Sequence, residues 1–325
     1  MALKIVVLNQ CFFSHHQLMR LRNIGCVTLY HDTDSEEKTI QRLCGATIAV
    51  ANGLFTPLTK KVFNATDHLR LLVINSTGFD FVDMEAALKR GVEVANVPGF
   101  STEAVSEHVF ALALAVIRKI TLADQAVRRV FFEINPSVRK SKMFLGSTLC
   151  GKTLGIVGLG TIGKRVAQLG MAFGMSIIAY NRTVGHVYNV RMVSLKELLQ
   201  KSDVISLHLA LSPETKKIIS TREFGFMKPS SIIINTARGG LMDTGALIKA
   251  LKLRRIFGAG LDVVDGLMKK RSILRLNTVV FSPHCGWWAQ ESLEWQSEII
   301  VQNIEAFVKG KPINIVSTNR KITKF

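Results

Sequence analysis

The first hundred residues place their hydrophobic positions in short runs separated by amphipathic stretches. The runs are rich in Val and Ile, as is typical of strands buried on both faces of a sheet. A stretch of helical periodicity, residues 82–90, is followed by Gly91, a residue type that often ends helices. Strands are therefore expected at residues 5–8, 27–30, 47–50, 71–74 and 92–97. Because strands alternate with helices, the pattern predicts a parallel sheet with helices on both faces.

A second alternating series begins at Lys152, and the linking segment is a long apolar helix through residues 111–116 with Ser101 as its expected N-cap. Residues 288–308 have the pattern of a single amphipathic helix. No internal repeat of short period is present. The expected strands of this series are 153–157, 176–180, 204–207, 231–235, 258–263 and 279–281. The chain is therefore expected to form two α/β units.

Composition supports packed cores, because 48% of the 325 residues are apolar. The longest apolar run, residues 109–117, is half the length that a membrane-spanning helix needs, and the run at residues 5–8 is too short for a signal-peptide core. The five cysteines are odd in number, widely spaced and free of any C-x-x-C pair. They favour a reducing cytoplasm over a disulfide framework or a thiolate metal site. His15, His16 and His108 belong to no ligand set in the sequence, so no metal is predicted.

The net charge of +18 is concentrated in the middle of the chain. Residues 101–284 contain 27 Lys and Arg against 11 Asp and Glu, whereas the two flanking segments are nearly balanced. Such a segment can serve nucleic acid or phosphate-bearing ligands, yet its basic runs carry no interleaved aromatic residues to stack on bases. The pattern favours a solvated basic surface over a nucleic-acid site.

A glycine motif follows the first strand of the second series. Gly158, Gly160 and Gly163 fit G-x-G-x-x-G, with a strand before them and a helix to about residue 173 after them. The first glycine allows a tight turn, the second lets backbone amides approach a pyrophosphate, and the third lets helix and strand pack closely. This context predicts a dinucleotide site.

The next strand ends in Asn181, Arg182 and Thr183, where NAD-binding proteins place an acidic residue on the ribose hydroxyls. An acid there repels a 2′-phosphate, whereas a neutral residue followed by Arg accepts it. NADP(H) is therefore favoured over NAD(H). The alternative is that Arg182 only covers the adenine face.

Two further strands end in residues suited to keto-acid chemistry. Arg238 follows the strand at 231–235 and can hold a carboxylate with two parallel hydrogen bonds. His284 follows the strand at 279–281 and can deliver the proton that hydride transfer to a ketone requires. Both lie at strand ends of one dinucleotide domain, which favours catalysis over structural roles.

The order and spacing of these stretches resemble the D-isomer-specific 2-hydroxyacid dehydrogenases. The likeness covers almost the whole chain, and further matches at residues 76–80, 96–99, 284–287 and 310–314 are most similar to the glycerate dehydrogenase (hydroxypyruvate reductase) branch. The stretches that carry it are the glycine motif, Ala237-Arg238-Gly239, Gly260-Leu261-Asp262-Val263 and Ser282-Pro283-His284.

The resemblance implies a Rossmann domain, residues 101–285, inserted into a flavodoxin-like substrate domain formed by residues 1–100 and 286–325. It also implies a homodimer. Ser76, Thr77 and Gly78 would offer loop amides to the substrate carboxylate. Asp262 would hold the nicotinamide carboxamide, and the cofactor would be lined by Thr161, Ile162, Thr236 and Ala237.

One departure from the family pattern concerns the carboxylate partner of the histidine. The family has a Glu immediately before a Pro, and this chain has Leu267 and Met268 at those positions. Without that carboxylate, the imidazole loses its fixed tautomer and the stabilisation of its protonated form. Asp265, two residues earlier, is a candidate substitute.

The sequence therefore predicts an oxidoreductase that reduces a small 2-keto acid, first glyoxylate or hydroxypyruvate, to a D-2-hydroxy acid with NAD(P)H, with activity lowered by Leu267. The alternative is a dinucleotide-sensing or interaction protein on the same fold that has lost turnover.

Overall fold

The computed structural model describes residues 3–129, 142–182, 187–264 and 272–317. Thr183, Asp265, Leu267 and Met268, which the sequence analysis singled out, lie outside the described residues. The chain divides into two compact units. Unit 1 comprises Met1–Ser101 and Trp288–Phe325, and unit 2 comprises Thr102–Trp287.

Unit 1 is built on a five-stranded sheet in the order β2-β1-β3-β4-β5, with every strand pair parallel. This is the flavodoxin-like order of a doubly wound sheet. Its strands are β1 (Leu3–Val7), β2 (Gly25–Leu29), β3 (Ile48–Ala51), β4 (Leu71–Ile74) and β5 (Glu93–Ala95). Its helices are α1 (His15–Ile24), α2 (Glu36–Leu43), α3 (Lys60–Asn64), α4 (Met84–Lys89) and α12 (Gln290–Val308).

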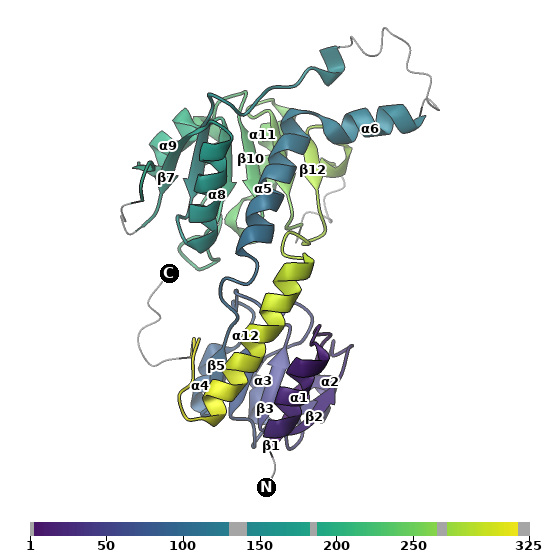
Figure 1. Cartoon of the computed structure of the whole chain (residues 1–325). Helices are drawn as coiled ribbons and strands as arrows, with labels where there is room; N and C mark the ends of the chain where they lie inside the picture. Colours follow the sequence, from purple (N-terminus) through teal and green to yellow (C-terminus); the bar gives the residue numbers. More distant parts are fainter. Residues whose placement is uncertain (1–2, 130–141, 183–186, 265–271, 318–325) are drawn as a thin grey trace. The chain divides into compact units, whose positions relative to one another are not determined.

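The last helix of the chain belongs to the first sheet. Helix α12 packs against α1 and β4, so the two ends of the sequence complete one unit (Figure 1). The Arg20 guanidinium on α1 joins Glu298 and Glu305 on α12, with its closest N–O distance to each carboxylate at 2.8 Å. Ser14 and Gln17 form a capping box that fixes the start of α1.

Unit 2 contains a seven-stranded parallel sheet in the order β12-β11-β10-β9-β6-β7-β8. Reading outward from β6, this is the Rossmann order. Its strands are β6 (Thr153–Val157), β7 (Ser176–Tyr180), β8 (Arg191–Met192), β9 (Val204–Leu207), β10 (Ile232–Asn235), β11 (Gly258–Leu261) and β12 (Val279–Phe281). Its α-helices are α5 (Thr102–Ile117), α6 (Ile120–Arg129), α8 (Thr161–Ala172), α9 (Leu195–Lys201), α10 (Thr221–Phe226) and α11 (Thr244–Lys252).

Apolar cores lie on both faces of this second sheet. Helices α5 and α8 cover one face (Figure 1), and α9, α10 and α11 supply the core of the other. The predicted α/β fold class with two parallel sheets is confirmed. Among the described residues, no helix is long and apolar enough to cross a membrane.

Candidate functional site

Three neighbouring strands of unit 2 end beside one another at the carboxyl edge of the sheet. β10, β11 and β12 are adjacent and parallel, and they lead into Arg238, Asp262 and His284 respectively. Two backbone hydrogen bonds connect the ends of neighbouring strands. Asp262 N donates to Asn235 O and Ser282 N donates to Leu261 O, each at 3.0 Å. Ligands bind at this edge in doubly wound folds.

Asp262 is the centre of the hydrogen-bond network at this edge. Its side chain is 2% exposed. Oδ1 accepts from the Ser282 hydroxyl at 2.6 Å and from Cys285 N at 3.0 Å, and Oδ2 accepts from Gly286 N at 2.9 Å. His284 N donates to the backbone oxygen of Asp262 at 2.8 Å. The loop that carries His284 is therefore folded around one carboxylate.

His108, on α5, completes this network from another part of the sequence. Its Nε2 lies 2.8 Å from the Ser282 hydroxyl oxygen and 3.4 Å from Asp262 Oδ1. Because the single Ser282 proton is donated to Asp262, His108 Nε2 must be the donor in the contact with Ser282. The sequence assigned His108 to no ligand set, and the fold brings its ring to within 4.8 Å of ligand atoms of Asp262 and Cys285.

The hydrogen bonds determine the charge of Asp262. Burial alone raises the pKa of this carboxyl, but the hydrogen bonds from His108, Ser282 and the two backbone N–H groups outweigh burial and lower the pKa to about 2. Asp262 is therefore ionised at neutral pH. Its negative charge holds the donors of the His284 loop in place.

His284 itself has an uncommon backbone conformation for a residue with a side chain. Its φ is 59°, in the left-handed region. Such conformations persist where surrounding contacts enforce them, and they cluster at functional sites. Here the bonds of Asp262 to the residues on both sides of His284 supply that enforcement.

The loop after β10 is organised around Asn235. Asn235 Nδ2 donates to Arg238 O at 2.9 Å, and Ala237 N donates to Asn235 Oδ1 at 3.0 Å. Arg238 Nη1 donates to Ala237 O at 2.9 Å, and the arginine is half-buried. A partly buried, pre-positioned guanidinium suits recognition of a carboxylate.

The glycine motif has the geometry that a dinucleotide requires. Gly158 has a φ of +104°, and a Cβ on Gly163 would lie 2.2 Å from Gly158 O, so these two positions need glycine for the turn and for packing. A Cβ on Gly160 would meet nothing within 4 Å, and Gly160 caps α8, whose first turn carries no acidic residue. The open space above a helix N-terminus fits a pyrophosphate.

Other predicted cofactor residues lie at the same edge. Thr161 and Ile162 form the first turn of α8, and Asn181 and Arg182 follow β7. Thr236 follows β10, and its buried Oγ1 has no hydrogen-bond partner among the described residues. Orphaned buried hydroxyls are uncommon, so this atom fits a site that a ligand completes.

His208 at the end of β9 was missed by the sequence analysis. Its Nε2 lies 2.8 Å from the Ser206 hydroxyl, and its backbone lies against Gly158. Desolvation lowers the pKa of His208 to about 4, so this imidazole is neutral at pH 7. A His after an apolar strand is its only sequence signal.

In unit 1, the predicted substrate loop follows β4. Ser76 Oγ donates to Gly78 O at 2.8 Å, and Thr77 Oγ1 donates to Val97 O at 3.0 Å. Asn96 Nδ2 donates to Thr77 O at 2.8 Å. These bonds hold the loop in a fixed shape at the carboxyl edge of the five-stranded sheet.

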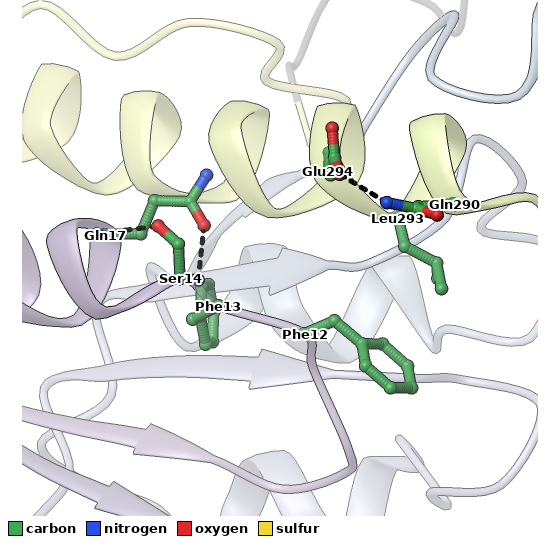
Figure 2. A pocket seen from close by; sticks show the side chains of 7 residues that line it. All are labelled: Phe12, Phe13, Ser14, Gln17, Gln290, Leu293 and Glu294. Atoms are coloured by element: carbon green, nitrogen blue, oxygen red, sulfur yellow. Dashed lines mark hydrogen bonds between the residues drawn. The ribbon is translucent and has the colours of Figure 1, made fainter.

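A cavity of about 590 Å³ lies elsewhere in unit 1, between the loop before α1 and the first turns of α12 (Figure 2). Gln17 closes one end through the capping box, and Gln290 and Glu294 are hydrogen bonded to each other on α12. The lining residues are Phe12, Phe13, Ser14, Gln17, Gln290, Leu293 and Glu294. It contains none of the site residues predicted from the sequence.

Comparison with known proteins agrees with the geometry. Residues 110–286 match the family described as D-isomer specific 2-hydroxyacid dehydrogenase, NAD binding domain. The chain is 41% identical over 264 residues to a glyoxylate reductase of Thermococcus litoralis, covering 79% of this chain and 80% of the relative. It is 37% identical over 297 residues to a glycerate dehydrogenase of Methylorubrum extorquens, covering 88% and 90%.

A solved structure extends the likeness to the whole architecture. An acyclic imino acid reductase in complex with NADPH and D-Arg has a TM-score of 0.89 and 34% identity, covering 97% of this chain and all of that chain. The resemblance drawn from the sequence motifs is thereby confirmed. The chain belongs to the D-isomer-specific 2-hydroxyacid dehydrogenase family, an oxidoreductase family with an NAD(P)-binding domain.

Proposed function

We propose that the protein transfers a hydride between NADP(H) and a 2-keto acid, giving the D-2-hydroxy acid. The observation that carries this proposal is the set of three adjacent strand ends, which presents Arg238 and the Asp262-supported His284 at one edge with the glycine motif. Relatives named glyoxylate reductase and glycerate dehydrogenase support glyoxylate and hydroxypyruvate as the first substrates to test.

Each residue has a defined role in this proposal. Arg238 and the amides of Ser76 to Gly78 bind the substrate carboxylate, and Arg238 also polarises the keto oxygen. His284 donates one proton to that oxygen during reduction and accepts it during oxidation. The bound cofactor supplies or accepts the hydride at C2. Reduction therefore consumes one NADPH and one proton for each hydroxy acid formed.

The cofactor is held by the glycine motif, Thr161, Ile162, Thr236 and Ala237. Asp262 is the residue expected to hold the carboxamide, but its carboxylate already accepts at least three internal hydrogen bonds. We therefore assign Asp262 first to positioning the His284 loop.

Selectivity for NADP(H) over NAD(H) rests on Asn181, Arg182 and Thr183. The imino acid reductase complex with NADPH supports this choice. We expect NADPH to bind at least about tenfold more tightly than NADH, because Arg182 pairs with the 2′-phosphate. Fluorescence titration of both cofactors measures the two dissociation constants, and equal or reversed constants would contradict the assignment.

The central experiment is a steady-state assay of several 2-keto acids with both cofactors. Turnover supports an enzyme. Cofactor binding without turnover supports the alternative, a dinucleotide-sensing or interaction protein, which Leu267 and the basic excess of residues 101–284 favour. The retained Arg238 and His284 oppose that alternative.

We also propose that unit 1 acts as the substrate domain and unit 2 as the cofactor domain. A homodimer and a cytoplasmic location complete the proposal. The five cysteines support that location, since none forms a disulfide.

A further inference from the structure

We propose that the amino edge of the unit 2 sheet binds the phosphate backbone of double-stranded DNA without reading its bases. This edge lies opposite the carboxyl edge that holds Arg238 and His284, so the proposal concerns a surface that the proposed reaction does not use. We call the surface the cationic edge, and it consists of Arg118, Lys119, Lys252, Arg254, Arg255 and Arg275.

The sheet topology brings separate stretches of the sequence to this edge. Helix α11 ends at Lys252, and Arg254 and Arg255 connect it to β11. Arg275 precedes β12, which is the parallel neighbour of β11. Neighbouring strands are about 4.8 Å apart, so the segments that enter β11 and β12 lie side by side.

The end of α5 reaches the same edge from the other face of the sheet. α5 and α11 supply the cores of opposite faces. A Cβ on Gly258, the first residue of β11, would lie 2.8 Å from Val116 Cγ1 and 2.4 Å from Thr278 O. Val116 is two residues before Arg118, and Thr278 is three residues after Arg275. The three stretches that carry the six cations therefore meet at the start of β11.

The charge of the cationic edge is not balanced by acidic residues. Residues 110–123, 250–258 and 272–281 contain all six cations and no Asp or Glu. Five of the cations are exposed, and none of the six forms an ion pair with a described residue. Lys228, which precedes β10, is paired with Asp203 at 2.9 Å, so the unbalanced charge is confined to the β11 and β12 side.

Two helices at this edge end in a cation at a position where glycine is usual. Lys119 after α5 has a φ of 55°, and Arg254 after α11 has a φ of 52°. Arg254 N donates to Leu251 O at 3.1 Å and Arg255 N donates to Ala250 O at 2.8 Å, which is the hydrogen-bond pattern of a Schellman motif. A side chain strains this left-handed conformation, so the retained cation favours a function for the charge.

The side chains of the cationic edge select the kind of anion. Residues 250–256 are Ala, Leu, Lys, Leu, Arg, Arg and Ile, which include no aromatic ring and no hydroxyl, amide or carboxylate group. Unpaired bases are bound by aromatic rings, and base edges and the ribose 2′-hydroxyl are read by groups that also accept hydrogen bonds. Lys and Arg alone suit the regularly spaced phosphates of a DNA duplex, whose non-specific binding needs no base contact.

The basic runs of the sequence by themselves favour a solvated surface, because each run is short and lacks aromatic residues. The fold adds that cations from three stretches share one edge. For a duplex the absence of aromatic rings is no obstacle, since its bases are already stacked on one another.

The first experiment measures binding of the full-length protein to a labelled DNA duplex of about 20 base pairs by fluorescence anisotropy, between about 50 and 200 mM KCl. The logarithm of the association constant should fall with the logarithm of the salt concentration. We expect a slope of magnitude at least about 3.6, the value for four neutralised phosphates. A shallower slope, or no binding at the lowest salt, overturns the proposal.

Comparison ligands test the choice of partner. A duplex of unrelated sequence should bind equally well, and a single strand of the same length should bind more weakly, because no ring is present to stack on its bases. An RNA duplex and poly-L-glutamate with the same number of charges complete the series. Tighter binding of the single strand, the RNA duplex or poly-L-glutamate than of the DNA duplex overturns the assignment to double-stranded DNA.

Saturating NADPH separates the cationic edge from the dinucleotide site. The glycine motif follows β6 at the carboxyl edge, so the DNA affinity should be the same with and without NADPH. Displacement of the duplex by NADPH would place the DNA on the dinucleotide site and overturn the proposal. The measurement needs no turnover, so the outcome for the proposed reaction does not affect it.

Variants locate the binding on the cationic edge. Arg254→Gly and Arg275→Gln should each lower the magnitude of the slope by about 0.9 and weaken binding about five- to tenfold at about 100 mM salt. Arg254→Lys keeps the charge and should keep the slope. In thermal melts Arg254→Gly should unfold no earlier than the wild type, because glycine suits the left-handed position, so its loss of binding is not a loss of folding.

The matched control is Lys216→Gln, which removes one positive charge at the other edge of the same sheet. Lys216 is exposed and follows β9, and its neighbour Lys217 pairs with Asp243 at the start of α11. Leu253→Ser, next to Arg254, tests for an apolar contribution. Neither control should change the slope. If either control weakens binding as much as Arg254→Gly, the assignment to the cations of this edge is wrong.

Discussion

At the scale of single residues, the loop that carries His284 depends on the buried carboxylate of Asp262. Asp262 binds the side chain of Ser282 and the backbone amides of Cys285 and Gly286, which bracket His284. A Cβ on Gly286 would lie 2.9 Å from Asp262 Oδ2, so residue 286 needs to be glycine for the carboxylate to be reached. The backbone of the His284 loop is thus held by the buried charge of Asp262 at the end of the neighbouring strand β11.

Replacing Asp262 with Asn should make the free energy of unfolding less dependent on pH below about pH 4. The folded-state pKa is lowered from 3.8 to about 2, so this carboxylate stabilises the fold above pH 4 and loses that contribution as the pH falls. Wild type should lose on the order of 1 kcal/mol more than Asp262→Asn between pH 6 and pH 3. Urea unfolding at each pH measures the difference, and parallel curves for the two proteins would disprove the linkage.

Leu267 offers a second test at this scale, drawn from the sequence alone. If the missing carboxylate limits proton transfer, Leu267→Glu should raise kcat by about ten to a thousandfold. If Asp265 already substitutes, Asp265→Asn should be the damaging change and Leu267→Glu neutral or harmful. If the wild type turns over rapidly and Asp265→Asn retains that rate, both hypotheses, the limiting Leu267 and the substitute Asp265, are wrong.

The sequence identified those site residues whose position follows from the residues next to them in the chain. The glycine motif, Arg238 and His284 each follow a strand, so their place at the sheet edge could be predicted. His108 could not be, because its partners are residues 262 and 282 and only the fold brings them together.

At the scale of elements, the turn between β6 and α8 contains glycines that are needed for two different reasons, helix packing and ligand space. Gly163 is required by packing, since a Cβ there meets Gly158 O, whereas the space above Gly160 is open. The fold requires a glycine at residue 163, and we assign the open space at Gly160 to the pyrophosphate.

These two demands predict opposite outcomes for two alanine variants. Gly163→Ala should destabilise unit 2 by about 1–3 kcal/mol, because backbone atoms must shift. Gly160→Ala should leave the melting temperature unchanged yet weaken NADPH binding at least about tenfold, because its methyl group occupies the ligand's space. Thermal melts measure the change in stability, and cofactor titration measures the change in NADPH affinity. Unimpaired NADPH binding by Gly160→Ala would show that the space at Gly160 does not hold the pyrophosphate.

The junction of α1 and α12 gives another prediction for an element. Arg20 holds two carboxylates at once, and its hydrogen bonds to Glu305 and Glu298 raise its pKa further above the usual value. Arg20→Gln should therefore cost about 1 kcal/mol, more than an isolated surface pair contributes. Urea unfolding with Lys89→Gln as the control should show no change for the exposed pair of Lys89 with Glu85. Equal effects would mean that the double contact adds nothing.

Most elements could be predicted because their hydrophobic period matches their burial. β4, β6, β7, β9 and β12 have the expected bounds. β8 was missed, since two residues, Arg191 and Met192, carry no readable period. The ends of β5 and β11 were placed too far along the chain, because apolar residues continue after the strand pairing stops.

At the scale of the whole molecule, charge is handled differently in the two units. In unit 1, Arg20, Arg42 and Arg90 each contact a carboxylate. In unit 2, the exposed Arg254 and Arg275 form no ion pair with any described residue, and they precede β11 and β12. Unit 2 also contains ion pairs, such as Arg165 with Glu103 and Arg222 with Glu223. Added salt therefore weakens attractions in both units, and in unit 2, which carries the basic excess, it also relieves repulsion.

The discontinuity of unit 1 has a consequence in time. Its sheet is encoded before Thr102, but the helix that covers α1 and β4 follows Trp287. During synthesis the ribosome must add the 186 residues from Thr102 to Trp287 first, which takes roughly ten to forty seconds. Through that interval the first sheet lacks the helix that packs on β4, so part of its apolar surface stays uncovered while unit 2 is being completed. A chain that stops before α12 thus leaves the ribosome with unit 2 complete and unit 1 incomplete, and the uncovered apolar surface of unit 1 then makes this form a target for chaperones and proteases.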